Sequence, residues 1–310
     1  MKKGNRSGSV MIVFLTVMML AFQGNAATTA KTTTAKTTTA AKTTTAAKTT
    51  TAAKTTTAAK TTAKKTTAKK TTSKKKTVRK WVTKGAFTYY TINGKVQKQF
   101  VTIGKKTYYF SKNKGVQRIG WRHIGKYYYY FRNVAGKGGY MLTNCTVDGI
   151  RINKKGHAVL KTADALRKTD LMQKYQRWAD RFITPGMSDE QKIYACLNQL
   201  RRFRYRNESD SFQVGSGNWD VVCAQELIGR KDDFMPTAEC YRIACGFCYL
   251  ANAAGLKDVR ICAMPGHGWS IVNGTIYDAT RVINRGSMEW FPVSSGHLGE
   301  YTAYFVRALN

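Results

Sequence analysis

Near its C-terminal end the sequence carries a cysteine, a histidine and an aspartate in the order Cys240, His267, Asp278. A thiol, an imidazole and a carboxylate are the groups that nucleophilic attack on an amide requires: the imidazole takes the thiol proton, and the carboxylate orients the imidazole. The chemistry that these three residues could perform together is acyl transfer through a thioester. They can do so only if the elements that carry them bring them together.

We expect the cysteine to open a helix that ends at Gly255. Thr237, which follows Pro236, is the expected N-cap, so that Cys240 lies in the first turn. Unpaired backbone N–H groups and the helix dipole favour an anion there. The Cys240 thiol is therefore expected to lose its proton more easily than a free thiol, whose pKa is about 8.5. The expected buried face, at three-to-four spacing, consists of Ile243, Phe247, Leu250 and Ala251.

The histidine and the aspartate are predicted to lie on the two strands of one hairpin. Asn273-Gly274 between two β-prone runs is a strong signal for a two-residue turn. Such a turn pairs Trp269 with Asp278 and His267 with Thr280, and all four side chains then share one face. His267 and Asp278 become diagonal neighbours, roughly 7–8 Å apart at the backbone. The pairs expected nearer the turn are Ser270–Tyr277, Ile271–Ile276 and Val272–Thr275.

Each of these residues also has an ordinary structural interpretation. A single helix cysteine is usually a small core residue, and a single strand histidine is usually a hydrogen-bonded polar group. Cys245 and Cys248 fit that interpretation, because they lie along the same helix as Cys240. No second pair of ligands follows Cys245-x-x-Cys248 at zinc spacing, so we expect no metal and no cofactor. The pairing of the seven cysteines stays open.

Taken together, these motifs resemble the transglutaminase-like superfamily. The resemblance rests on the cysteine helix ending in Leu-Ala-x-x-x-Gly-Leu at 250–256, on His-x-Trp at 267–269, on Tyr-Asp-x-Thr at 277–280, and on an entry segment at 183–192. It covers roughly residues 160–310. It implies an α+β, papain-like or transglutaminase-like catalytic domain over 161–310, with Cys240, His267 and Asp278 as the catalytic residues.

The implied activity is that of a cysteine peptidase or amidase acting on peptide or isopeptide bonds of a peptide or protein substrate. One alternative is a crosslinking transglutaminase, in which a lysine amine resolves the thioester. Another is a non-catalytic wall-binding or adhesive protein with a degenerate fold of this type. Within the domain we expect helices over 161–206, with a break near Thr169-Asp170 and a capping box formed by Ser188 and Gln191. The expected apolar face of the first helix consists of Leu166, Leu171, Tyr175, Trp178 and Phe182.

The N-terminal segment 1–26 is typical of a signal peptide. Lys2, Lys3 and Arg6 precede an apolar run from Val10 to Phe22, and Gly24-Asn25-Ala26 offers small residues for cleavage. This run is shorter than the roughly 20 residues of a comfortable membrane span. We therefore expect a secreted or cell wall-associated protein that meets the membrane only through its signal peptide.

The net charge of +35 is concentrated at the N-terminus. Residues 1–80 hold 18 of the 52 Lys and Arg residues and no Asp or Glu. Residues 27–80 repeat an Ala-Lys-Thr-Thr-Thr unit without large apolar residues, which predicts a disordered, self-repelling linker. A basic exported protein is expected to bind an anionic cell-wall polymer or glycan. Nucleic acid would satisfy the same charge, but export argues against it, and we expect no specific nucleic-acid partner.

Residues 81–160 carry an internal repeat of aromatic and glycine residues. The copies start at Gly85, Gly104, Gly125 and Gly149, which are 19, 21 and 24 residues apart. Each copy predicts β-hairpins that must stack on their neighbours to bury their rings. The pattern resembles the cell-wall-binding repeats of the choline- or glucan-binding type. Trp121 is its one tryptophan at the usual position, so binding of an anionic or neutral wall polymer fits better than binding of choline.

Overall fold

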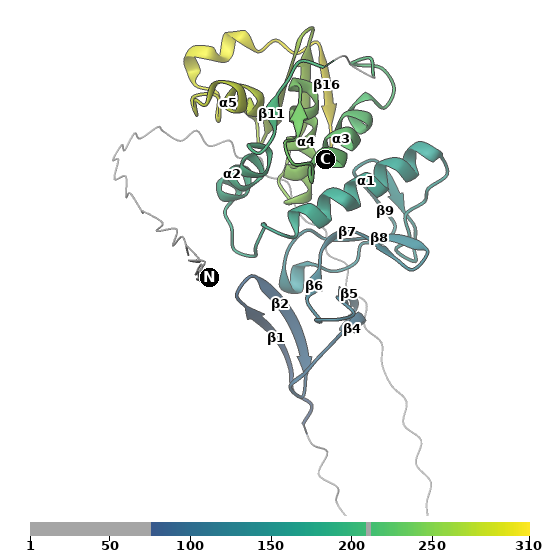
Figure 1. Cartoon of the computed structure of the whole chain (residues 1–310). Helices are drawn as coiled ribbons and strands as arrows, with labels where there is room; N and C mark the ends of the chain where they lie inside the picture. The colour runs from purple at the N-terminus through teal and green to yellow at the C-terminus, as the bar shows by residue number, and fades with distance from the viewer. Residues whose placement is uncertain (1–75, 209–211) are drawn as a thin grey trace, which may run out of the picture. The chain divides into compact units, whose positions relative to one another are not determined.

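The computed structural model describes residues 76–208 and 212–310 (Figure 1). All of them belong to the second of two units into which the chain divides, residues 71–310. The predicted signal peptide and most of the predicted linker lie outside the described residues. In the described part, no helix combines the length and the apolar character that crossing a membrane requires.

The repeat region consists of four consecutive β-hairpins, as the sequence predicts. The repeat glycines lie in the turns, where Gly85, Gly104, Gly125 and Gly149 have φ values of 53°, 63°, 61° and 77°. A left-handed turn of this kind suits glycine and matches the twist of hairpin strands. The strands are β1 (Arg79–Lys84), β2 (Phe87–Ile92), β3 (Lys95–Val96), β4 (Gln99–Ile103), β5 (Lys106–Phe110), β6 (Gln117–Arg118), β7 (Gly120–Ile124), β8 (Tyr127–Phe131), β9 (Cys145–Val147) and β10 (Ile150–Ile152).

Aromatic rings join each hairpin to the next. Trp81 of the first hairpin meets Tyr108 of the second edge-on, with ring centroids 5.1 Å apart. Phe100 of the second hairpin meets Tyr129 of the third at 5.2 Å. In the third hairpin Trp121 is buried, and its indole N–H donates to Asp148 in the turn of the fourth at 2.7 Å. The hairpins therefore bury their rings against one another, because a single hairpin has no core of its own.

The predicted helical region contains two helices, α1 (Ala163–Ala179) and α2 (Asp189–Leu200). The expected break at Thr169-Asp170 is wrong: α1 is continuous, and the Thr169 hydroxyl is satisfied by the Ala165 carbonyl at 2.7 Å. Of the residues expected on the apolar face of α1, Leu171, Tyr175 and Trp178 are buried, whereas Leu166 is exposed. The capping box of Ser188 and Gln191 is confirmed.

The C-terminal part places helices against one antiparallel sheet. Its strand order is β15-β14-β13-β16, and the pairs predicted next to the Asn273-Gly274 turn are confirmed. The remaining elements are β11 (Arg204–Tyr205), α3 (Trp219–Arg230), β12 (Thr237–Ala238), α4 (Cys240–Ala253), β13 (Arg260–Met264), β14 (His267–Val272), β15 (Thr275–Tyr277), α5 (Ala279–Arg285), β16 (Phe305–Ala308) and the short 3-10 turns Gly136–Gly138 and Ser295–Glu300.

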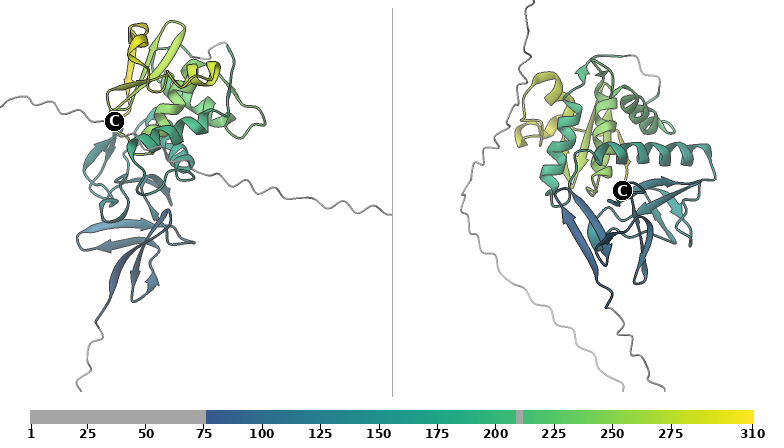
Figure 2. Two further views of the ribbon diagram at one scale, coloured as in Figure 1. Left: turned by 90° about the vertical axis from the view of Figure 1, so that its left-hand side faces the viewer. Right: turned by 60° about the horizontal axis from the view of Figure 1, so that its bottom comes forward.

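The third and fourth hairpins share their core with these helices. Trp121, Tyr128, Ile150 and Ile152 belong to the same hydrophobic cluster as the buried side chains of α1 and α4. Figures 1 and 2 show α1 lying along β7 and β8. The first two hairpins bury a separate cluster around Tyr90, Tyr108 and Phe110. The hydrophobic core therefore runs across residue 160, where the sequence suggested a domain boundary.

We expect Gly120→Ala to destabilise the protein strongly. At φ 71° a β-carbon on residue 120 would stand 1.8 Å from Oε1 of Gln176 on α1, so this buried side chain would have to leave the place where β7 meets α1. The combined strain and overpacking should cost roughly 2–4 kcal/mol. Urea unfolding followed by circular dichroism measures this cost.

Gly104→Ala is the matched control. It has a similar φ of 63° and open space around its position, so it should lose only about 1–2 kcal/mol. Equal losses in the two variants would contradict close packing of β7 on α1.

Candidate active site

The three residues predicted to act together are carried by α4, β14 and the start of α5. Cys240 is the first residue of α4, as expected, although Glu239 and not Thr237 is the N-cap. His267 is the first residue of β14, next to the tight turn that joins it to β13. Asp278 is the N-cap of α5, and its side chain accepts from the Arg281 N–H at 2.9 Å.

The structure joins His267 to Asp278 directly. The imidazole Nε2 lies 2.6 Å from Asp278 Oδ2, and the carboxylate is fully buried. Because an ionised carboxylate only accepts, Nε2 carries a proton and Nδ1 is the ring nitrogen left to take another. The Tyr301 hydroxyl donates to the same oxygen at 2.8 Å. The imidazole therefore has an orienting partner that is itself held in place.

The route to this contact differs from the predicted one. The β14–β15 ladder ends at the pair Ser270–Tyr277, so the expected pairs Trp269–Asp278 and His267–Thr280 do not form. The chain turns into α5 at Asp278 because its carboxylate caps that helix. His267, at the start of β14, therefore contacts Asp278 at the N-terminus of α5, and the two residues are not diagonal neighbours in a longer β-ladder.

Two sets of contacts bring Cys240 to the same place. Its Sγ donates to the Gly266 carbonyl oxygen at 3.8 Å, and the Gly268 N–H lowers the pKa of the thiol; these two glycines stand on either side of His267. The Thr280 hydroxyl, in the first turn of α5, donates to the Cys240 carbonyl at 3.5 Å. Among the described residues, however, no hydrogen bond joins Sγ to the His267 ring, so the catalytic role of these residues stays a prediction.

The prediction of a low pKa for the Cys240 thiol is wrong, because its surroundings raise this pKa. Burial raises its pKa above the ordinary value, and the Glu239 carboxylate, with Oε2 only 3.4 Å from Sγ, raises it further. The N–H groups of Gly268 and Tyr241 act in the opposite direction but do not reverse the shift. The thiol is therefore protonated at neutral pH, and a base would have to remove its proton during reaction.

Sequence reasoning missed Glu239 and Tyr301. The Glu239 carboxylate accepts hydrogen bonds from the first-turn N–H groups of Tyr241 and Arg242 at 2.6 and 2.9 Å. These N–H groups are the donors that were expected to stabilise a Cys240 thiolate. A carboxylate next to a helix start is a readable signal for such a cap. Tyr301 lies 23 residues beyond its partner Asp278 and has no such signal.

The other cysteines behave as ordinary thiols. None of the seven cysteines forms a disulfide bond, and six are buried, the exception being the half-buried Cys145. Burial raises the pKa of Cys245 and Cys248, as expected for core residues of α4. Within the described residues no group of three or more His, Cys, Asp or Glu side chains is arranged to hold a metal ion.

Part of the chain is similar to solved choline-binding proteins. Choline binding protein F from Streptococcus pneumoniae is 28% identical over 26% of this chain and 26% of its own, with a TM-score of 0.24. The choline binding domain of Spr1274 from the same organism is 25% identical over 26% of this chain and 92% of its own, with a TM-score of 0.23. Alternansucrase in complex with isomaltononaose is 20% identical over 28% of this chain and 9% of its own, with a TM-score of 0.19.

The chain thus spans about a quarter of the length of choline binding protein F. No protein-family model and no curated protein sequence matches the chain.

We expect Glu239→Gln to speed alkylation of Cys240. Removing the negative charge 3.4 Å from Sγ lowers the thiol pKa, so at any fixed pH below that pKa more thiolate is present. A shift of half a unit to one unit corresponds to roughly a three- to tenfold faster reaction. Iodoacetamide labelling followed by mass spectrometry between pH 6 and 10 measures the rate.

Cys145 serves as the internal reference, because burial is the only cause that shifts its thiol pKa and Glu239 does not contribute, so it should label equally in both proteins. An unchanged Cys240 rate in the variant would show that Glu239 does not control the thiol.

Proposed function

We propose that the protein binds a cell-surface polymer through its hairpins and carries a cysteine acyl-transfer site in its C-terminal part. Polymer binding is supported by the rings that the hairpins leave exposed. Phe87, Phe100 and Tyr127 are 49%, 43% and 37% exposed, whereas the other Phe, Tyr and Trp rings of the hairpins are buried or half-buried. Exposed aromatic faces beside lysines suit the faces of sugar rings and their anionic substituents.

Choline is a poorer candidate ligand for these hairpins. Trp121, the tryptophan at the usual position of the repeat, is 2% exposed, and its indole N–H donates to Asp148. It therefore has no free face for a quaternary ammonium group, whose recognition depends on open aromatic rings. A sugar polymer of the wall remains the ligand that the exposed surface suits best.

The acyl-transfer site is supported by a single observation, the 2.6 Å contact between His267 Nε2 and the buried Asp278 carboxylate beside Cys240. In the proposed reaction His267 Nδ1 removes the Cys240 proton as Sγ attacks an amide carbonyl. The C–N bond then breaks, and the imidazolium returns the proton to the leaving amine. Asp278 keeps the imidazole oriented and stabilises its charged form.

The thioester left on Cys240 is resolved by water in a peptidase or amidase, which is the activity we favour. Resolution by a lysine amine would make the same site a crosslinking transglutaminase. The remaining candidate is a non-catalytic wall-binding protein, in which Cys240 is a buried structural thiol. Its low exposure of 5% and raised pKa favour that candidate, so the tests must separate binding from catalysis.

We expect the full-length protein to sediment with purified Gram-positive cell walls and Cys240→Ala to sediment equally well. The exposed rings lie on the hairpins, whereas the Cys240 thiol lies at the start of α4 in the C-terminal part. The double variant Phe100→Ala/Tyr127→Ala should lose about three- to thirtyfold in affinity, since each stacked ring contributes of the order of 1 kcal/mol. Tyr304→Ala, which removes an exposed ring of the C-terminal part, is the control. Equal binding by all variants would exclude the hairpin rings.

We expect the wild-type protein to release free amine from wall-derived peptides and to form a hydroxylamine-sensitive acyl adduct on Cys240. Cys240→Ala should abolish both, and His267→Ala should lower the rate by about 10²–10⁴-fold, because the proton transfer loses its base. Asp278→Asn keeps an acceptor for the α5 cap and should lower the rate less.

Cys145→Ala is the matched control and should keep full activity. Incorporation of a fluorescent amine in place of hydrolysis would identify the crosslinking alternative. A protein that binds walls but forms no adduct would be the non-catalytic alternative.

A further inference from the structure

We infer that a basic groove between the hairpins and the C-terminal end of α1 binds an anionic group on a sugar polymer. The inference rests on the polymer-binding part of the proposed function and does not involve the cysteine site. The groove has a volume of about 580 Å³ and is bounded by β2, β5, β6, β7 and α1. Pockets of about 300–1,000 Å³ are typical of small-molecule sites, so one or two sugar units fit this space.

The groove is strongly positive. Residues 81–147, which supply its hairpin side, contain 12 Lys and Arg residues and no Asp or Glu. On the helix side α1 adds arginines, and Asp180 at its C-cap is the one carboxylate in the lining. A concave surface with this excess of one sign concentrates ions of the other sign. The lining cations are Lys112, Lys114, Arg118, Arg122, Arg177 and Arg181.

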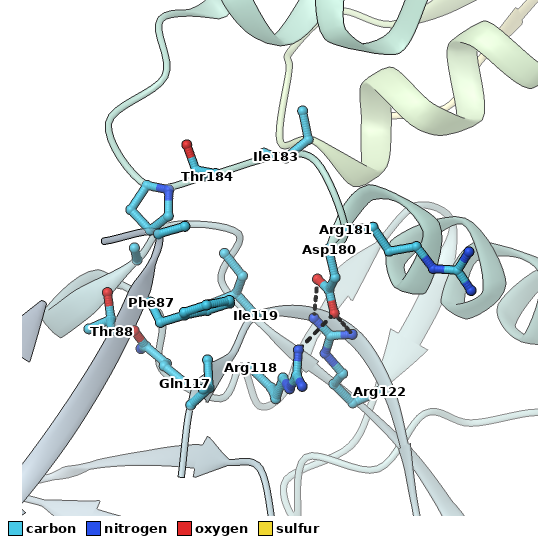
Figure 3. A pocket seen from close by; sticks show the side chains of 14 residues that line it. Phe87, Thr88, Gln117, Arg118, Ile119, Arg122, Asp180, Arg181, Ile183 and Thr184 are labelled. Carbon is cyan, nitrogen blue, oxygen red and sulfur yellow. Dashed lines mark hydrogen bonds and ion pairs between the residues drawn. The ribbon is translucent and has the colours of Figure 1, made fainter. Parts of the chain in front are cut away.

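Arg118, Arg122 and Asp180 form an ion-pair cluster in the lining of the groove. Arg122 meets Asp180 through two hydrogen-bonding nitrogens at 2.8 Å, and Arg118 Nη1 lies 3.2 Å from the same carboxylate. Figure 3 shows Asp180 pointing from the end of α1 onto these two guanidinium groups. Two guanidinium groups share one carboxylate, so the cluster keeps a net positive charge toward the groove.

Arg122 provides an independent sign of a missing acceptor. Its side chain is more than nine-tenths buried, yet its Nε–H has no acceptor in the described part of the chain. Buried donors are almost always satisfied, and an unsatisfied one points to an ion, a water molecule or a ligand. Arg122 lines the groove, so its guanidinium group adds positive charge to the wall that an anionic group would meet.

Aromatic rings line the same groove and specify the rest of the ligand. Phe87, Tyr89 and Tyr109 belong to its wall, and Phe87 is 49% exposed. A smaller, mainly apolar recess of about 110 Å³ shares Phe87 and the ion-pair cluster with the groove, and Figure 3 shows Phe87 beside Ile119 in its wall. An inorganic ion alone would make no use of these rings, whereas a sugar stacks on them while its anionic group meets the arginines.

The groove is formed before any ligand arrives. The absence of a side chain at Gly120 lets β7 lie close to Gln176 of α1, and the contacts of Asp180 with Arg118 and Arg122 join the end of α1 to β6 and β7. A site held by packed elements loses little entropy on binding. The polymer would consequently be bound where the hairpins meet the helical part and not only along the exposed hairpin rings.

The test compares polymer binding by full-length variants. Lys114→Gln/Arg177→Gln removes two exposed groove cations that form none of the Asp180 ion pairs. Lys154→Gln/Lys155→Gln removes two exposed cations of the turn that follows β10, outside the groove lining, and is the matched control. The probes are purified glycerol-phosphate teichoic acid, polygalacturonate and neutral dextran, with affinity measured by biolayer interferometry between 50 and 300 mM NaCl.

We expect the groove variant to bind the anionic polymers about tenfold more weakly than wild type, equivalent to about 1.4 kcal/mol, and with a shallower salt dependence. The control variant should stay within about twofold. Phe87→Ala should also weaken polymer binding while leaving weak binding of inorganic phosphate unchanged, because the ring contacts only the sugar. Comparison of the phosphate polymer with the carboxylate polymer identifies the anionic group that is preferred.

Equal losses in the groove and control variants would overturn the groove as the site while leaving polymer binding by the hairpins intact. Equal binding of dextran and the anionic polymers would overturn the anionic character of the ligand. Absence of binding to any wall polymer would instead remove the proposed function itself.

Discussion

The burial of almost all of α4 is the constraint on which the rest of the C-terminal part depends. Thirteen of its 14 residues are buried, and α1, α2 and α3 pack against it together with β13 and β14. A helix that is apolar all round is stable only when other elements cover every side. Gly246 permits α3 to pack closely on α4, because a β-carbon there would stand 2.6 Å from the Leu227 side chain of α3. Cys240 is thereby held at a fixed point, where the buried helix begins beside β14.

Burial also forces charges at the start of α4 to be paired internally. Arg242 is 2% exposed, and its guanidinium meets Glu226 at 2.6 Å and Glu239 at 3.0 Å. Removing one partner of such a buried group typically costs about 3–5 kcal/mol, because the other is left uncompensated. The same Glu239 caps the helix and raises the pKa of Cys240. The Glu239 carboxylate therefore stabilises the fold and at the same time makes the Cys240 thiol less reactive.

The hairpins and the helices form one packed structure through β7 and α1. Trp121 and Tyr128 reach the core of the C-terminal part, while Asp180 at the end of α1 holds arginines of the hairpins from outside. A junction with both apolar packing and a charged rim is stiffer than a linker between two separate domains. A polymer bound near this junction would thus be placed at a set position relative to the His267–Asp278 pair.

The sequence alone determined the elements whose signals are local. The hairpin turns follow from glycine's tolerance of positive φ, the α2 start from the Ser188–Gln191 capping box, and the β14–β15 register from Asn273-Gly274. Local patterns could not show that α4 is covered on all sides or that α1 continues through Thr169, because both depend on packing against distant segments. Likewise, only the tertiary structure placed Glu239 against the thiol, Tyr301 on Asp278, and Asp180 between two hairpin arginines. Charges far apart in sequence meet only when the core is closed, and their meeting sets the chemistry of both sites.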